Sequence, residues 1–236
     1  MTEQINSKNA IIELLEADPK KIAKVVIEKG LKGDKINRII ELCKSNSVRF
    51  DLVPAKEGAR GDERTGVYAL ISSFEYTDLN DLSLSEIKCA VILDEIEDPH
   101  NFGAIVRTAA ASGAGAVIIP DRNAAQVTET VIAVSAGTIY KIKVCKVKNI
   151  AVAIEKLKES GFWITGTDMD GSADYKNYDF TAKAAIVIGN EGKGLRRLVK
   201  EKCDDIVRID LSNGVESLNA SVAAALILFE VKRKNG

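Results

Sequence analysis

The sequence predicts an α/β protein whose larger part is a parallel β-sheet covered by helices. The runs AVILD (90–94) and AAIVIG (184–189) are apolar throughout, and segments of helical spacing separate such runs. Strands of a parallel sheet read in this way because helices cover both faces of the sheet. Hydrophobic residues make up 46% of the 236 residues, which is enough to form the core of such a sheet.

Apolar spacing places the other elements of this larger part. We expect strands at 90–94, 116–120, 142–147, 163–167, 184–189 and 206–211. We expect helices at 102–112, 124–135, 149–160, 194–202 and 217–233. The alternation of strands and helices predicts that the strands form one sheet.

The first part of the chain predicts a separate, small α/β domain. We expect helices at 9–17 and 34–46, strands at 23–28, 49–53 and 67–76, and a polar, glycine-bearing loop at 55–66. Residues 77–88 are polar and weakly patterned, which is typical of a linker. The predicted organisation is a first domain at 1–76, a linker at 77–88 and a second domain at 89–236.

Composition excludes several classes of protein. The chain has 33 Lys and Arg against 34 Asp and Glu, which argues against binding nucleic acid by bulk positive charge but allows a local basic face. One histidine and four separated cysteines without a C-x-x-C pair argue against a metal site and a disulfide framework. Without a long apolar run or a signal-peptide pattern, we expect a cytoplasmic protein that does not enter membranes.

The loop after the strand at 90–94 is the first candidate for chemistry. It reads DEIEDPHNFGAIVR (94–107), in which Asn101 is a plausible helix N-cap and Gly103 allows a close approach of a ligand or a second backbone. Arg107 lies about a turn and a half into the expected helix. By itself this loop is typical of a capped helix with a solvated arginine.

The loop after the strand at 184–189 is the second candidate. Three glycines lie within the six residues 189–194, with Glu191 between two of them, and an ordinary turn needs only one glycine. The spacing does not match a Walker A loop. The basic side chains that follow, among them Lys193, Arg196 and Arg197, are typical of a solvated helix face but are also placed to receive phosphates.

The third candidate is the segment 209–230, which leads through the turn dipeptide Asn213-Gly214 into a long apolar helix. Ser217 and Asn219 are polar groups near the strand end, and either is also a candidate helix cap. The only histidine, His100, does not form part of a G-x-S-x-G hydrolase pattern. A dinucleotide-dependent dehydrogenase is disfavoured because its glycine fingerprint is missing.

Together the three loops resemble the three sequence motifs of the SpoU family of RNA 2′-O-methyltransferases. The matching stretches are DPHNFGAIVRTAAASGAGAVIIP (98–120), IVIGNEGKGL (186–195) and VESLNASVAAALILFE (215–230). The segment from INSKNAIIELLE to GVYALISSFEY resembles the small ribosomal-protein-like, substrate-binding domain of many members. The resemblance covers nearly the whole chain, and three motifs in order are far more specific than one.

The resemblance implies a catalytic domain with a deep trefoil knot tied by about residues 184–233. It also implies an obligate homodimer in which each site borrows residues from the partner. The implied cofactor is S-adenosylmethionine, held in a bent shape, and the implied substrate is a ribose in structured RNA. No metal is implied.

The resemblance also transfers site residues by motif position. The catalytic set is Asn101, Arg107, Glu191, Ser217 and Asn219. The cofactor-binding set is Thr167, Gly189, Asn190, Gly192, Ile209, Leu211 and Leu218. Apart from the resemblance, the basic side chains that follow the glycine loop give an expected RNA-binding set of Lys193, Arg196 and Arg197.

The chain departs from the family pattern in two main places, besides a minor change at Ala220, where valine is usual. Ile209-Asp210-Leu211 replaces the usual Ile-Pro-Met, and Arg64-Thr65-Gly66-Val67 replaces His-Gln-Gly-Val. The resemblance predicts 2′-O-methylation of a guanosine in 23S rRNA. The alternatives are a tRNA 2′-O-methyltransferase, or a non-catalytic RNA-binding or ribosome-assembly relative, which only the Asp210 substitution favours.

Overall fold

The computed structural model describes residues 2–54 and 66–235. The chain forms two compact units, one of residues 1–75 and 127–141 and the other of residues 76–126 and 142–236. The loop predicted at 55–66 lies, apart from Gly66, outside the described residues.

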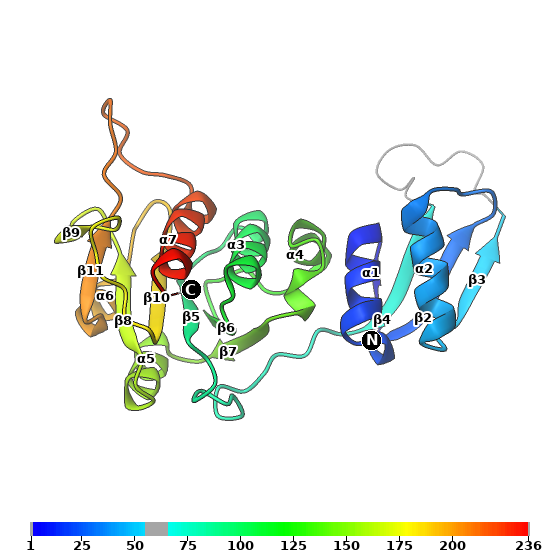
Figure 1. Cartoon of the computed structure of the whole chain (residues 1–236), viewed down its shortest axis with the longest axis horizontal. Helices are drawn as coiled ribbons and strands as arrows, with labels where there is room; N and C mark the ends of the chain where they lie inside the picture. Colours follow the sequence, from blue (N-terminus) through cyan, green and yellow to red (C-terminus); the bar gives the residue numbers. More distant parts are fainter. Residues whose placement is uncertain (1, 55–65, 236) are drawn as a thin grey trace. The chain divides into compact units, whose positions relative to one another are not determined.

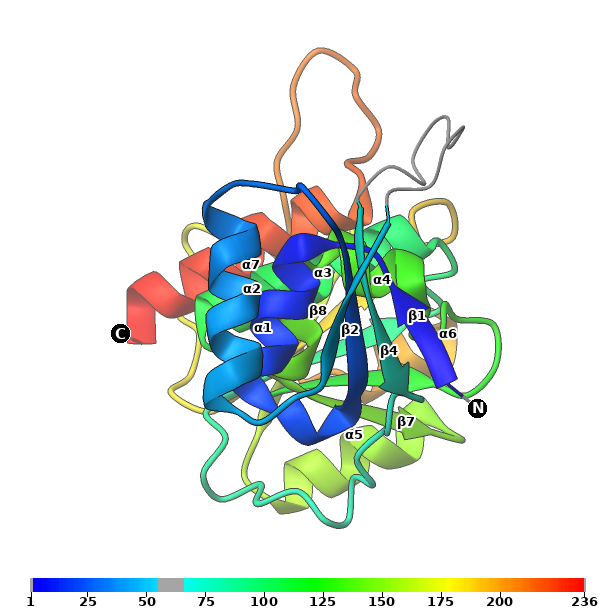
Figure 2. The same ribbon diagram turned by 90° about the vertical axis from the view of Figure 1, so that its right-hand side faces the viewer.

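The first unit is a four-stranded sheet with two helices on one face. Its strands are β1 (Thr2–Ile5), β2 (Ile22–Glu28), β3 (Phe50–Val53) and β4 (Val67–Ser72), in the order β1-β4-β2-β3. The helices α1 (Lys8–Ala17) and α2 (Asp34–Ser45) pack against each other beside the sheet (Figure 2). The small α/β arrangement is as predicted, except that β1 was not expected. Its sequence, TEQI, carries little apolar pattern, and antiparallel pairing with β4 is what makes it a strand.

Residues 127–141 follow the second unit's strand β6 in the chain but pack with the first unit. They form α4 (Glu129–Val134) and the short 3-10 helix η3 (Thr138–Tyr140). Lys141 forms an ion pair with Glu13, and the Asn6 amide donates a 2.5 Å hydrogen bond to Glu129. Helix α4 is shorter than the helix predicted at 124–135. The Ala125 N–H donates a hydrogen bond to the Ile96 carbonyl, so this part of the chain does not form a helical turn.

The second unit contains the predicted parallel sheet. Its strands are β5 (Cys89–Asp94), β6 (Ala116–Pro120), β7 (Lys143–Val147), β8 (Trp163–Thr167), β9 (Ala173–Asp174), β10 (Ala184–Gly189) and β11 (Asp205–Arg208). They lie in the order β7-β6-β5-β10-β8-β11-β9, and every neighbouring pair is parallel. Two details differ from expectation. The two-residue strand β9 was not predicted, and β11 ends at Arg208 rather than at residue 211.

Helices cover both faces of this sheet (Figure 1). Helices α5 (Ile150–Glu159) and α6 (Arg197–Lys202) pack against each other, and Ile154 and Val199 join the core that includes Ile92 and Val187 of the strands. Helices α3 (Pro99–Ser112) and α7 (Ala220–Asn235) pack against each other over β6 and β10. The strands are apolar throughout because each side chain meets one of these two layers.

The start of α3 corrects one prediction. Asp98, not Asn101, is the N-cap: its carboxylate accepts the His100 N–H at 2.9 Å, and Pro99 occupies the first helical position. Proline suits that position because its missing N–H would be unpaired there anyway. Asn101 therefore lies inside the first turn, where its side chain is free for another contact. Similarly, α7 begins after Ser217 and Asn219, at Ala220.

Residues 77–88 pack as part of the second unit. Leu79 and Leu84 are buried in the same core as α5, and the Thr77 N–H donates to the Val144 carbonyl at 2.9 Å. The leucines of this polar segment therefore anchor it. Within the described ranges, no helix combines the length and the apolar character needed to cross a membrane.

Burial of the four thiols yields a first prediction. Burial raises the pKa of Cys89 and Cys203 to about 12 and that of Cys43 and Cys145 to about 11. We expect DTNB at about pH 8 to label the native protein far more slowly than the urea-unfolded protein, because the thiolate is the reactive form. The free energy of unfolding should also fall as pH rises from about 9 towards 11, since the folded pKa values exceed the unfolded value of about 8.5. A fast-labelled native thiol would contradict this.

Candidate active site

The candidate site lies where the central strands of the parallel sheet end. Strands β5, β10, β8 and β11 are neighbours, so their carboxyl ends meet at one edge. The loops that leave this edge after β5, β10 and β11 are the three loops singled out by the sequence. An open parallel sheet binds its ligands at this edge.

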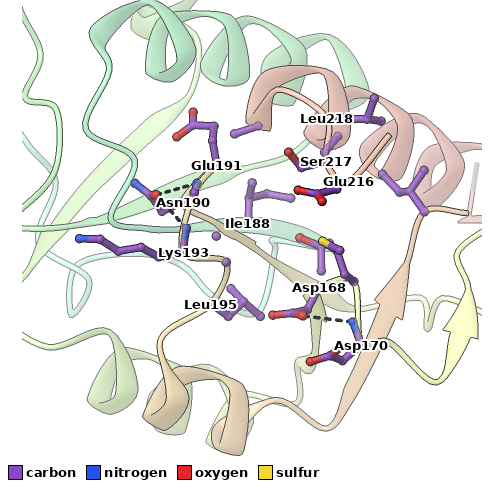
Figure 3. Close-up of a pocket in the computed structure, with 18 of the residues that line it drawn as sticks. Asp168, Asp170, Ile188, Asn190, Glu191, Lys193, Leu195, Glu216, Ser217 and Leu218 are labelled. Atoms are coloured by element: carbon purple, nitrogen blue, oxygen red, sulfur yellow. Dashed lines mark hydrogen bonds between the residues drawn. The ribbon is translucent and has the colours of Figure 1, made fainter. Parts of the chain in front are cut away.

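A pocket of about 510 Å³ opens between the segments that follow β8, β10 and β11 and the start of α7 (Figure 3). All seven residues of the predicted cofactor set line it: Thr167, Gly189, Asn190, Gly192, Ile209, Leu211 and Leu218. Glu191 and Ser217 of the predicted catalytic set line it as well, as does Lys193. Asn101, Arg107 and Asn219 are not among the lining residues.

The glycine loop after β10 folds back on itself and forms one wall. Asn190 and Gly194 exchange main-chain hydrogen bonds of 3.1 and 2.9 Å, and the Asn190 side chain accepts the N–H of Gly192 and Lys193. A Cβ at position 189 would lie 2.5 Å from the Gly194 carbonyl carbon, so only glycine fits there. The closure thus depends on Gly189 and on the Asn190 amide.

The opposite wall offers unpaired main-chain donors. The N–H groups of Leu211 and Leu218 have no hydrogen-bond partner among the residues that the structure describes. Buried side chains, including Ile188, Leu195 and Val207, form an apolar floor. A pocket of this size with an apolar floor and a few main-chain donors suits a flat heterocycle bearing polar groups.

A chain of hydrogen bonds joins the three loops beside this pocket. The Asn219 amide donates to the Asn101 side-chain oxygen at 2.9 Å, and the Asn101 amide in turn donates to the Glu191 carboxylate. Asn219 also accepts the Ser221 N–H at 2.9 Å, so it caps the start of α7. Asn101 therefore contacts both Glu191, which is 90 positions away, and Asn219, which is 118 positions away. The three residues were predicted from separate loops.

A second link between the loops was not predicted. The Asp94 side chain is fully buried at the end of β5, and it accepts hydrogen bonds from the Arg196 main-chain N–H at 2.9 Å and from the guanidinium Nε at 2.7 Å. Arg196 also lies 3.4 Å from Glu95. Its guanidinium is thus engaged within the protein, which disfavours the predicted RNA contact. The sequence did contain a signal for this link, because Asp94 is an acidic residue at the end of an otherwise apolar strand.

The other predicted residues are exposed. Arg107 lies on the surface of α3, with no hydrogen bond or ion pair to any described residue, and Ser217 is exposed at the pocket rim. Arg197 is 91% exposed and pairs with Glu201 at 3.1 Å. The charge of the Asp210 substitution is balanced, because Arg208 Nε lies 2.7 Å from the Asp210 carboxylate.

The sequence did not predict that several charged residues line the pocket. Lys200 lies 3.1 Å from Asp168 and 3.2 Å from Asp170. Partial burial lowers the pKa of Lys200, but the two carboxylates outweigh it and raise the pKa above its ordinary value. Glu216 also lines the pocket. Nothing in the spacing of these residues signalled a shared site, since they come from three separate segments.

Comparison with known proteins decides the family. Residues 88–229 match the model of the SpoU rRNA methylase family, and residues 8–77 match the model described as RNA 2′-O ribose methyltransferase substrate binding. The chain belongs to the SpoU rRNA methylase family. The chain is also similar to the protein YacO of Bacillus subtilis (strain 168), named as a TrmH family tRNA/rRNA methyltransferase, with 42% identity over 98% of this chain and 96% of YacO.

Solved structures of the SpoU family share the fold. The SpoU methyltransferase AviRb from Streptomyces viridochromogenes is similar with a TM-score of 0.83 and 25% identity, over 99% of this chain and 90% of that one. Its complex with the cofactor AdoMet is similar with a TM-score of 0.81 and 24% identity, over 98% and 89% of the two chains. The parallel sheet predicted from the sequence is therefore that of a SpoU methyltransferase.

The contrast between two adjacent arginines gives a second prediction. Arg196→Ala removes the partner of a buried carboxylate and should reduce the free energy of unfolding by roughly 2–3 kcal/mol, less than the about 3–5 kcal/mol of a fully buried pair because the Arg196 side chain is 44% exposed. That corresponds to a fall in Tm of about 5–10 °C in calorimetry. Arg197→Ala is the matched control and should change Tm by less than about 2 °C. Equal effects of the two changes would show that the Asp94 pair is not structurally important.

Proposed function

We propose that the protein transfers a methyl group from S-adenosylmethionine to the 2′-hydroxyl of a guanosine ribose in structured RNA, with 23S rRNA as the favoured substrate. The observation that carries this proposal is the Asn219–Asn101–Glu191 chain, which joins side chains of all three motif loops beside the pocket. Family membership supplies the reaction class. The name YacO carries, tRNA/rRNA methyltransferase, keeps tRNA as the second candidate substrate.

The pocket fits S-adenosylmethionine. When bound, this cofactor supplies an electrophilic methyl group on a sulfonium. The apolar floor at Ile188 and Leu195 suits the adenine ring. The unpaired N–H groups of Leu211 and Leu218 suit the ring nitrogens of adenine or the carboxylate of the methionine part of the cofactor. The related AviRb, crystallised in complex with AdoMet, supports this choice.

The side chains of the site act by positioning. We assign Glu191 to ordering the glycine loop, Asn101 and Asn219 to fixing the motif loops, and Ser217 to holding the ribose or the cofactor end. Arg107 clamps the phosphate next to the target nucleotide and orients the hydroxyl for in-line attack. A guanidinium with a pKa above ~12 is a poor general base, so we assign it no proton transfer.

We further propose a homodimer in which Arg107 serves the partner's site. Arg107 is exposed and does not line the pocket of its own chain. Beside it in the fold, α7 exposes Val222, Leu226 and Phe229 by 47%, 38% and 48%, and their spacing places them on one face of the helix. An apolar stripe of this kind supports association with a second copy.

Two finer features complete the proposal. We infer that the segment 184–233 forms the family's trefoil knot; the return of the chain through 209–219 to α7, which packs on β10, supports this. We also assign RNA binding to the first domain, residues 1–76, which the substrate-binding family model matches over 8–77. Lys193 at the pocket and the exposed Arg197 are the remaining candidates for phosphate contacts.

Cofactor binding and RNA methylation together test the reaction. We expect calorimetry to detect saturable binding of S-adenosylmethionine with about one site per chain. We expect tritiated methyl groups to enter the ribose of a 23S rRNA transcript and not bulk tRNA. Labelling of tRNA alone would establish the second candidate, and absence of binding by the folded protein at about millimolar cofactor would indicate a non-catalytic relative.

The shared site is tested by subunit complementation. As homodimers, the Arg107→Ala protein and the Glu191→Ala protein should each have methyltransferase activity about a hundredfold below wild type. The two variant chains are then co-expressed with different affinity tags. The purified heterodimer should regain about half of the wild-type activity, because one of its two sites then combines Arg107 and Glu191 from different chains. If the two residues act within one chain, the heterodimer will be as inactive as both homodimers.

A further inference from the structure

The segment that follows β8 presents a carboxylate to the pocket with one oxygen unused. Asp168 is held rigidly: its N–H donates to the Val207 carbonyl at 3.0 Å, and its carbonyl accepts the Gly171 N–H at 3.1 Å. Its Oδ1 lies 3.1 Å from Lys200 and accepts the Asp170 N–H at 3.2 Å. Its Oδ2 has no partner within the described part of the chain.

The unused oxygen faces the space that the glycine loop leaves open. A Cβ at position 194 would lie 3.2 Å from Asp168 Oδ2, and Gly194 has a φ of +65°, so this side of the pocket is kept free of side chains. The Asp168 side chain is only 15% exposed. Figure 3 shows its carboxylate on the side of the pocket that Leu195 lines. A nearly buried acceptor with an open approach is suited to a ligand donor.

We propose that Asp168 binds the vicinal hydroxyls of the cofactor's ribose and thereby sets the protein's preference for a ribonucleoside-containing cofactor. This inference rests on the proposed use of S-adenosylmethionine. The acidic residue of dinucleotide-binding sheets accepts the ribose 2′-hydroxyl, and Asp168 Oδ2 has two lone pairs with which to accept the hydroxyls of a vicinal pair. The neighbouring Thr167 does not compete, since its hydroxyl donates to the Val187 carbonyl at 3.0 Å.

Position and charge both favour the ribose over the other parts of the cofactor. In Figure 3, Asp168 and Glu191 lie on opposite sides of Ile188. The methyl group must lie near Glu191 and Asn101 to reach the RNA, which leaves the Asp168 side to the adenosine. Lys200 already balances the charge of Asp168, so a neutral pair of hydroxyls suits it better than the sulfonium or ammonium group.

The test compares two proteins and two ligands by calorimetry. The ligands are S-adenosylhomocysteine and its 2′-deoxy analogue, and the proteins are wild type and Asp168→Asn. We expect the wild type to bind the deoxy analogue about tenfold or more weakly, the usual effect of losing a hydrogen bond to a charged group. In Asp168→Asn the affinity for S-adenosylhomocysteine should fall by a similar factor, and the preference for the 2′-hydroxyl should shrink to less than about threefold.

The outcomes separate this inference from the proposed function. If the wild type binds neither S-adenosylmethionine nor S-adenosylhomocysteine, the proposed function fails. The assignment of Asp168 is wrong if the wild type binds S-adenosylhomocysteine and its 2′-deoxy analogue equally well. It is also wrong if a folded Asp168→Asn protein keeps the full preference for S-adenosylhomocysteine over the deoxy analogue. The wild-type comparison needs no variant, so it decides the matter even if Asp168→Asn does not fold.

Discussion

The buried carboxylate of Asp94 is the constraint on which the site depends. It ends β5, in the middle of the parallel sheet, and its side chain has no exposed surface. A charge in such a place destabilises the fold unless a counter-charge and hydrogen bonds satisfy it. Arg196 supplies both, through its guanidinium and its own main-chain N–H. The end of the glycine loop is therefore fixed to the end of β5 by the need to neutralise one carboxylate.

The other contacts of the site follow from this fixed point. Asn190 ties the beginning of the glycine loop to the same segment, by donating to the Glu95 carbonyl at 2.9 Å. With both of its ends held, the loop closes on itself between Asn190 and Gly194 and carries Glu191 to Asn101. The same loop thus forms one wall of the pocket and supplies Glu191 to the hydrogen-bond chain. Without the Asp94 pair, the loop would keep its contacts through Asn190 but would lose the anchor at its far end.

The sequence predicted the sheet well because a strand buried on both faces has an apolar pattern that needs no partner to be recognised. It predicted the pocket lining through the resemblance to the family motifs. A position in a motif indicates which residues share a site, whereas apolar spacing indicates only helices and strands. It failed where the outcome depends on pairing between distant residues. Asp94 and Arg196 are 102 positions apart. Locally, Asn101 looked like a cap, but Asp98 followed by Pro99 forms the cap and leaves Asn101 to reach Glu191.

The form of α7 supports the proposal that a second chain completes the site. Ile227 and Leu228 on its inner side are buried, and Val222 and Phe229 on another face are almost half exposed. A helix that is apolar on opposite sides is usually covered on both. This helix begins directly after Asn219, so whatever covers its outer face lies close to the pocket and to α3, which carries the unpaired Arg107. Under the proposed dimer, one association buries the stripe and brings Arg107 to the partner's pocket, which no arginine of the described part of its own chain lines.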